Sequence, residues 1–146
     1  MSNNQMVIFA IKTNSEDLIT RYNDFSKNII KASHTNSFNE RVECLKKAEI
    51  KKGKFESLLK EMIENKLVIG KSFRDYLLDD IQDLPLTYRL KNGLFTTEEL
   101  KQVNKEIKLN KELTNTFLSL LQDVQDDEVF IFWNMEESEA NALLSY

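Results

Sequence analysis

Cys44 and His34, the only cysteine and the only histidine of this 146-residue chain, are the one pair that could form a nucleophilic site. A thiol acts as a catalytic nucleophile when a base lies beside it. Cys44, however, directly precedes Leu45 in an apolar helical stripe, where a thiol usually serves as a small packing group. With one residue of each type, the chain also lacks the ligands for a disulfide framework or for most zinc sites. We predict that Cys44 packs in a core and that the protein is not an enzyme.

Clustered carboxylates could instead hold a hard cation such as Mg²⁺, which prefers oxygen ligands. There are two such clusters: Asp79, Asp80 and Asp83, and Asp126, Asp127 and Glu128. Neither has the spacing of a calcium-binding loop, and only three glycines are available for a phosphate-binding loop. We therefore expect no metal and no cofactor, and a small carboxylate-based enzyme remains only as the last alternative.

A basic stretch in the first half of the chain could bind nucleic acid. It consists of Lys46, Lys47, Lys51, Lys52 and Lys54. The stretch contains no arginine and no interleaved aromatic residue, and the whole chain carries a net charge of −4. We interpret it as a solvated helix face and expect no direct contact with nucleic acid.

The end of the chain is strongly acidic, because no lysine or arginine follows Lys111. Unpaired carboxylates are costly to bury and must therefore lie at the surface, where they attract basic partners. We predict that seven of them bind a partner: Asp123, Asp126, Asp127, Glu128, Glu136, Glu137 and Glu139. The alternative is an acidic face that only keeps the protein soluble, or that balances the charge of the basic first half of the chain within the fold.

Trp133 adds an aromatic residue to this acidic end. In a strand, alternation places Val129, Ile131 and Trp133 on one face and Phe130 and Phe132 on the other. If the rest of the protein covers both faces of this strand, these residues belong to the hydrophobic core. An open face would make Trp133 a binding hot spot rimmed by acids, and we include it in the predicted partner-binding set.

The hydrophobic pattern predicts a mainly α protein, a compact single-domain helical bundle over residues 1–146 with two short strands near its ends. The apolar runs 6–11 and 129–133 favour these strands, which could pair with each other. Capping-box spacing predicts helix starts at 13–16, 37–40 and 96–99. Only three glycines and one proline argue against a turn-rich β-sandwich.

Breaks between the helices are expected at several positions. Gly53 either bends one long helix or separates two, and Gly70 precedes a short helix that Pro85 ends. Residues 88–95 are expected to be irregular, with a turn at Asn92–Gly93. A further break is expected near Asn110, and a last helix over residues 135–144.

Two features predict a cytoplasmic location. No basic region precedes the apolar run at residues 6–11, so a secretory signal is not expected. No apolar run approaches the roughly 20 residues that a membrane span needs. We expect no contact with a membrane.

These observations favour a non-enzymatic, protein-binding inhibitor. Its acidic end would neutralise a basic partner such as a nuclease toxin, as immunity proteins do; the comparison rests on size and charge and not on a shared motif. The alternative is a structural or regulatory helical module that self-associates, for instance as a homodimer, because residues 1–74 have a net charge of +5 and residues 75–146 one of −9.

Overall fold

The computed structural model describes residues 5–107 and 110–146. Within them the chain forms two compact units, one around a β-sheet and one built from two helices. The sheet unit combines the residues before Ser15 with those from Lys66 onward, and the helical hairpin is residues 15–65. The hairpin is therefore inserted between two segments of the sheet unit.

The sheet has four antiparallel strands: β1 (Met6–Thr13), β2 (Ile69–Arg74), β3 (Asn92–Thr96) and β4 (Val129–Glu136). Their order is β2-β1-β4-β3, so that β1 and β4 are central and β2 and β3 form the edges. The two strands expected near the chain ends are both present and pair with each other, with Phe9 opposite Trp133.

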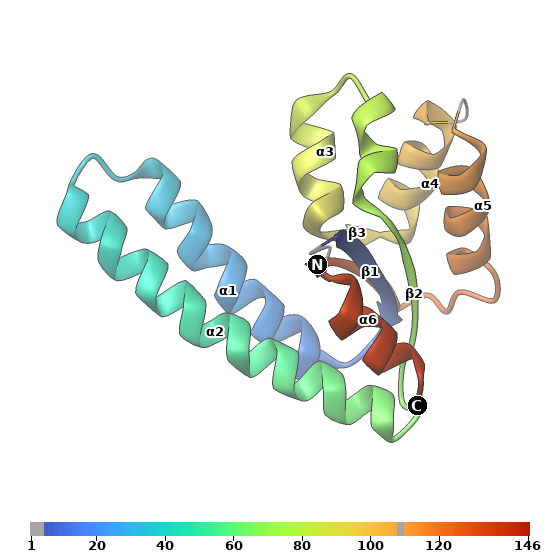
Figure 1. Cartoon of the computed structure of the whole chain (residues 1–146), viewed down its shortest axis with the longest axis horizontal. Coiled ribbons are helices and arrows are strands. Elements are labelled where there is room, and N and C mark those ends of the chain that lie inside the picture. Colours follow the sequence, from blue (N-terminus) through green and yellow to red (C-terminus); the bar gives the residue numbers. More distant parts are fainter. Residues whose placement is uncertain (1–4, 108–109) are drawn as a thin grey trace. The chain divides into compact units, whose positions relative to one another are not determined.

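Helices on one face of this sheet come from the middle of the chain: the 3₁₀ helix η1 (Asp75–Asp80), α3 (Leu84–Lys91), α4 (Thr97–Glu106) and α5 (Lys111–Leu120). Their buried residues share one cluster with Ile8, Ala10, Phe130 and Phe132 of the central strands. The last helix, α6 (Glu137–Leu144), contacts β1, β2 and β4 without joining that cluster, which places it on the opposite face (Figure 1).

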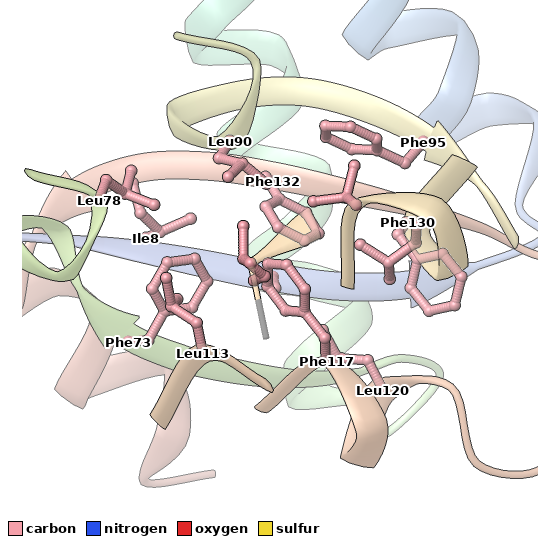
Figure 2. Close-up of a cluster of buried hydrophobic side chains, with 14 of the residues drawn as sticks. Ile8, Phe73, Leu78, Leu90, Phe95, Leu113, Phe117, Leu120, Phe130 and Phe132 are labelled. Atoms are coloured by element: carbon pink, nitrogen blue, oxygen red, sulfur yellow. The ribbon is translucent and has the colours of Figure 1, made fainter. Parts of the chain in front are cut away.

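Phe132 lies at the centre of the cluster (Figure 2). Its ring centroid is 5.3 Å from that of Phe95, 5.5 Å from that of Phe117 and 6.0 Å from that of Phe73. Tilted and edge-to-face pairs at such distances add to the free energy gained by burial. The aromatic residues therefore tie β2, β3, β4 and α5 together from four distant parts of the sequence.

The hairpin consists of α1 (Glu16–His34) and α2 (Phe38–Glu64). The rings of Tyr22 and Phe55 meet edge to face at 6.1 Å, and Arg21 Nη1 donates a hydrogen bond to the carbonyl oxygen of Lys54 at 2.9 Å. Cys44 is buried in α2, as a packing role requires. The helix continues through Gly53, so this glycine does not divide it into two.

The mainly α class is confirmed, but the expectation of two short strands is corrected to a four-stranded sheet. The segment around Gly70 is β2, because a glycine there leaves room for the Phe9 ring; an added Cβ would lie 2.2 Å from that ring. The expected turn at Asn92–Gly93 is the start of β3.

Two helix boundaries also differ from those expected. Pro85 lies in the first turn of α3 instead of ending a helix, a position where its missing N–H costs nothing. The last helix begins at Glu137 because β4 continues to Glu136. In the described part of the chain, no helix combines the length and the apolar character that crossing a membrane requires.

Candidate functional site

The seven acidic residues predicted to bind a partner fall into two groups at opposite ends of β4. Asp123, Asp126, Asp127 and Glu128 precede the strand, and we call them the turn cluster. Glu136 is the last residue of the strand, Glu137 and Glu139 follow in α6, and we call these three the α6 cluster. At about 3.3 Å per residue, the eight residues of β4 separate the two groups by roughly 23 Å. They do not form one continuous surface.

Trp133 is the eighth predicted residue, and only 1% of it is exposed. Its neighbours Phe130, Ile131 and Phe132 are buried as well, so both faces of β4 are covered at this point. Trp133 is therefore a core residue of this structure and is not part of the accessible acidic surface.

The turn cluster follows from local sequence signals. After α5 ends at Leu120, Asp123 adopts a positive φ of 54°, a left-handed conformation that ends helices and that Asp tolerates better than most residues. Glu128 Oε1 then accepts a hydrogen bond of 2.7 Å from the backbone N–H of Gln125. Asp127 Oδ2 accepts one of 3.3 Å from Asn14 Nδ2. These bonds hold the segment just before β4.

A hollow of about 450 Å³ opens between this turn and the start of α4. Three carboxylates of the turn cluster, those of Asp126, Asp127 and Glu128, line it. Glu98 and Lys101 of α4 contribute from the other side. Leu121, Val124 and Val129 supply its apolar wall. The hollow thus combines negative charge with apolar surface.

The carboxylates of both clusters form no ion pair with any residue that the structure describes. The ion pairs within the described residues join Arg21 to Asp17, Arg89 to Glu99, Lys91 to Asp75 and Lys101 to Glu98. None of them involves a member of the turn cluster or the α6 cluster. Among the described residues, no ion pair therefore joins either cluster to the basic first half of the chain.

Glu137 of the α6 cluster lies near a cation, Arg74. The Tyr76 hydroxyl accepts a 2.6 Å hydrogen bond from Arg74 Nη1 and raises the pKa of Arg74 above its usual range. The charges of Glu112 and Glu137 add to this effect. Glu136 and Glu139 are exposed, and no hollow among those described is lined by the α6 cluster. The turn cluster is therefore the better candidate site.

Sequence reasoning missed a second acidic hollow of about 550 Å³, between η1, α3 and the end of α4. Asp80, Asp83 and Glu106 line it together with Ile81 and Ile107. Asp83 Oδ1 is already engaged as the cap of α3, accepting a 3.1 Å hydrogen bond from the Leu86 N–H. No signal along the chain links Glu106 to Asp80, because only tertiary folding brings them together.

The other candidate sites from the sequence are the possible metal-binding clusters, the Cys44–His34 pair and the basic stretch. Among the described residues, no three His, Cys, Asp or Glu side chains are grouped so that they could hold a metal ion. His34 is exposed at the end of α1, whereas Cys44 is buried in α2. The lysines of the basic stretch lie along α2, where Lys46, Lys47 and Lys54 are exposed.

Chemically, the turn cluster and its hollow can accept a group that is both cationic and apolar. Lysine and arginine side chains have this character, since an aliphatic stem carries the charged head. Known proteins give no further guide: the chain matches no protein-family model, and neither the curated proteins nor the solved structures contain a significant match.

Proposed function

We propose that the protein is a non-enzymatic binding protein that inhibits a basic partner by docking the partner's lysine or arginine side chains at the turn cluster. The observation that carries this proposal is the 450 Å³ hollow, where Asp126, Asp127 and Glu128 meet an apolar wall. An inhibitor of a nuclease, acting as immunity proteins act, is the form of this function that we favour. In such a complex, carboxylates occupy the places that nucleic-acid phosphates would take in a basic cleft.

Charge supports the proposal on two scales. The sheet unit holds 15 Asp and Glu against 10 Lys and Arg, a net charge of −5, whereas the hairpin has a net charge of +1. A field of one sign accelerates the encounter with an oppositely charged partner. The carboxylates of the turn cluster form no ion pair with a described residue, so no such ion pair has to break before they bind the partner.

A defined basic probe tests the binding site. We would measure the affinity of the full chain for a fluorescein-labelled peptide that alternates arginine or lysine with leucine, by anisotropy at several salt concentrations. Each exposed charge pair is worth up to about 1 kcal/mol. We therefore expect the double variant Asp126→Lys, Asp127→Lys to bind about tenfold more weakly or worse, with a flatter salt dependence.

The α6 cluster provides a matched control. The double variant Glu136→Lys, Glu139→Lys changes the net charge by the same amount at two positions that are also exposed, and it should bind nearly as well as the native chain. Lys51→Glu with Lys52→Glu should strengthen binding slightly or leave it unchanged. Equal losses in the two acid-to-lysine variants would show that net charge alone attracts the peptide, and the turn cluster would lose its role.

The inhibitory role needs the natural partner. Basic proteins that the native chain retains from its source, and that the Asp126→Lys, Asp127→Lys variant does not retain, can be identified by mass spectrometry and assayed for nuclease activity. We expect the native chain to abolish that activity and the variant to leave most of it. Retention of the same proteins by both forms would contradict the proposal.

A further inference from the structure

The outer edge of β2 is the feature that points to a second binding surface. Among the strands of residues 5–107 and 110–146, β2 pairs with β1 alone, and Phe73 is the only buried residue of β2. The strand runs along the outside of the sheet and contacts α5 and α6 (Figure 1). The side chain of Ile69, the first residue of the strand, is accessible too, since Ile69 is 76% exposed.

The ladder identifies which residues of β2 point outward. Gln5 O accepts a hydrogen bond of 2.9 Å from Glu137 N, which fixes the side of β1 that faces β4. Because residues in an antiparallel ladder alternate in direction, Ile8, Ala10 and Lys12 then face β2. Their partners are Phe73, Lys71 and Ile69. The remaining residues of β2, which are Gly70, Ser72 and Arg74, direct their N–H and C=O groups away from the sheet.

The opposite edge, β3, is closed by the protein itself. The same alternation points Asn92, Leu94 and Thr96 outward, and each has a partner there. Asn92 N donates to the carbonyl oxygen of Tyr88, Leu94 O accepts from Arg89 Nη2 at 3.1 Å, and Thr96 N donates to Glu99 Oε1 at 3.0 Å. On β2, the C=O group of Arg74 is taken up by the first turn of η1, because Arg74 is the N-cap of that helix. No residue described in the structure bonds to the outward groups of Gly70 and Ser72. The two edges differ, and β2 is the open one.

We propose that β2 accepts an extended acidic segment of a partner protein as a fifth strand of the sheet. Unpaired edge groups are a template for strand addition, a common way to bind peptides. β2 carries Lys71 and Arg74 and contains no acidic residue. This surface goes beyond the proposed function, since it lies on another element and selects a partner of the opposite charge.

Lys71 sets the charge preference. Its own N–H and C=O groups face β1, so an added strand meets it in a non-hydrogen-bonded pair, where side chains are closest. A carboxylate opposite Lys71 therefore forms a favourable cross-strand pair, whereas a cation there is repelled. Lys71 is exposed and forms no ion pair with a described residue. Arg74 contributes less, because Glu112 and Glu137 already lie near it.

The same lysine disfavours a second copy of this chain as the added strand. Two copies of β2 could pair antiparallel about a two-fold axis, with the outward N–H and C=O groups of one copy bonded to those of the other. If the whole strand is used, the axis passes through Lys71 or through Ser72. The first arrangement places Lys71 opposite its own copy, and the second places the two lysines diagonally on one face. Like charges in these positions destabilise a sheet, and lysine on an edge strand is a known protection against self-pairing.

Labelled eight-residue peptides with alternating valine test the proposal on the full chain. An acidic peptide alternates valine with glutamate, a basic one replaces glutamate with lysine, and a third is the acidic peptide with N-methyl groups on alternate residues. We expect the acidic peptide to bind and to perturb the amide signals of Gly70 and Ser72. N-methylation in the matching register should weaken binding about tenfold or more, because it removes ladder donors. Equal binding of acidic and basic peptides would overturn the proposal.

Variants of β2 locate the site. Ser72→Pro removes one outward N–H and leaves the β1 ladder intact, since proline is tolerated on the free side of an edge strand. It should lose peptide binding, whereas Ser72→Thr, which retains the N–H, should bind normally. Lys71→Gln should weaken binding of the acidic peptide and reduce its salt dependence. If Ser72→Pro proves unfolded by circular dichroism, the N-methylated peptide and Lys71→Gln still decide the matter.

Two further outcomes separate this proposal from its rivals. The Asp126→Lys, Asp127→Lys variant should bind the acidic peptide at least as well as the native chain, so failure of the turn-cluster proposal would not affect this one. Sedimentation that shows a dimer of the native chain, lost in Ser72→Pro, would identify a second copy as the occupant of β2. That result would overturn the assignment of an acidic partner segment.

Discussion

Gly53 shows most simply how one residue's surroundings decide its contribution. It lies inside α2, and apart from its chain neighbours and the backbone of its own helical turns no atom comes within 4 Å of the position that a Cβ would take. Glycine in a helix interior costs about 1 kcal/mol relative to alanine because the unfolded backbone is freer. Nothing in the structure offsets that cost at this position.

We expect Gly53→Ala to stabilise the hairpin by about 0.5–1 kcal/mol, measured by urea unfolding followed through helical circular dichroism. Gly93→Ala is the matched opposite, because its Cβ would lie 2.1 Å from the carbonyl oxygen of Arg89 and the backbone would have to move. It should destabilise the sheet unit. A destabilising Gly53→Ala would mean that the open space around Gly53 is filled in solution.

At the scale of the element, the start of α4 is the clearest case in which sequence, geometry and charge agree. Thr96 Oγ1 accepts a hydrogen bond from Glu99 N, and Glu99 Oε1 accepts one from Thr96 N, so the capping box expected from the sequence is confirmed. The backbone N–H of Thr96 lowers the pKa of Glu99 most, burial opposes it, and Arg89 lowers it further.

This pKa predicts a pH dependence of stability. A carboxyl whose pKa is lowered by folding stabilises the protein above its ordinary pKa of 4.5, and that contribution is lost as the pH falls through the folded value. Glu99→Gln keeps an acceptor but removes the charge. It should be less stable than the native chain at neutral pH, and the difference should vanish in acid. A difference that grows on acidification would contradict the assigned cause.

The two strands that the sequence did not predict, β2 and β3, show the limit of local patterns. β2 has a single buried residue and reads as a polar segment, and β3 begins with an Asn–Gly pair that is typical of a turn. Each becomes a strand because a neighbour offers a ladder: β1 pairs with β2, and β4 pairs with β3. Edge strands depend on such partners more than on their own composition.

For the whole molecule, the division into two units has a measurable consequence. Residues within a compact unit open together, and units with separate cores open with separate free energies. We expect hydrogen exchange to show one shared opening free energy for the amides of α1 and α2 and a different one for those of β1 and β4. Identical opening energies and denaturant dependence across the chain would instead support the single domain expected from the sequence.

The sequence alone determined what short-range interactions control. Helix starts at Ser37 and Thr96 could be predicted because a capping side chain bonds to an N–H three residues away. Near Asn110 the sequence indicated only a break, and the structure shows that Asn110 caps α5 there. The central strands β1 and β4 could be predicted because each contains a continuous apolar run. The excess of acidic residues after Lys111 follows from composition alone, and the expectation of exposed carboxylates follows from that excess.

Only the tertiary structure decided which of these residues meet. Glu98 joins Asp126 at one hollow, across a gap of 28 positions, and the same fold buries Trp133 and separates the acids into two groups. The open edge of β2 and the closed edge of β3 likewise depend on which strand pairs with which. Pairing and burial sum interactions between distant segments, so neither composition nor periodicity within a short stretch can specify them.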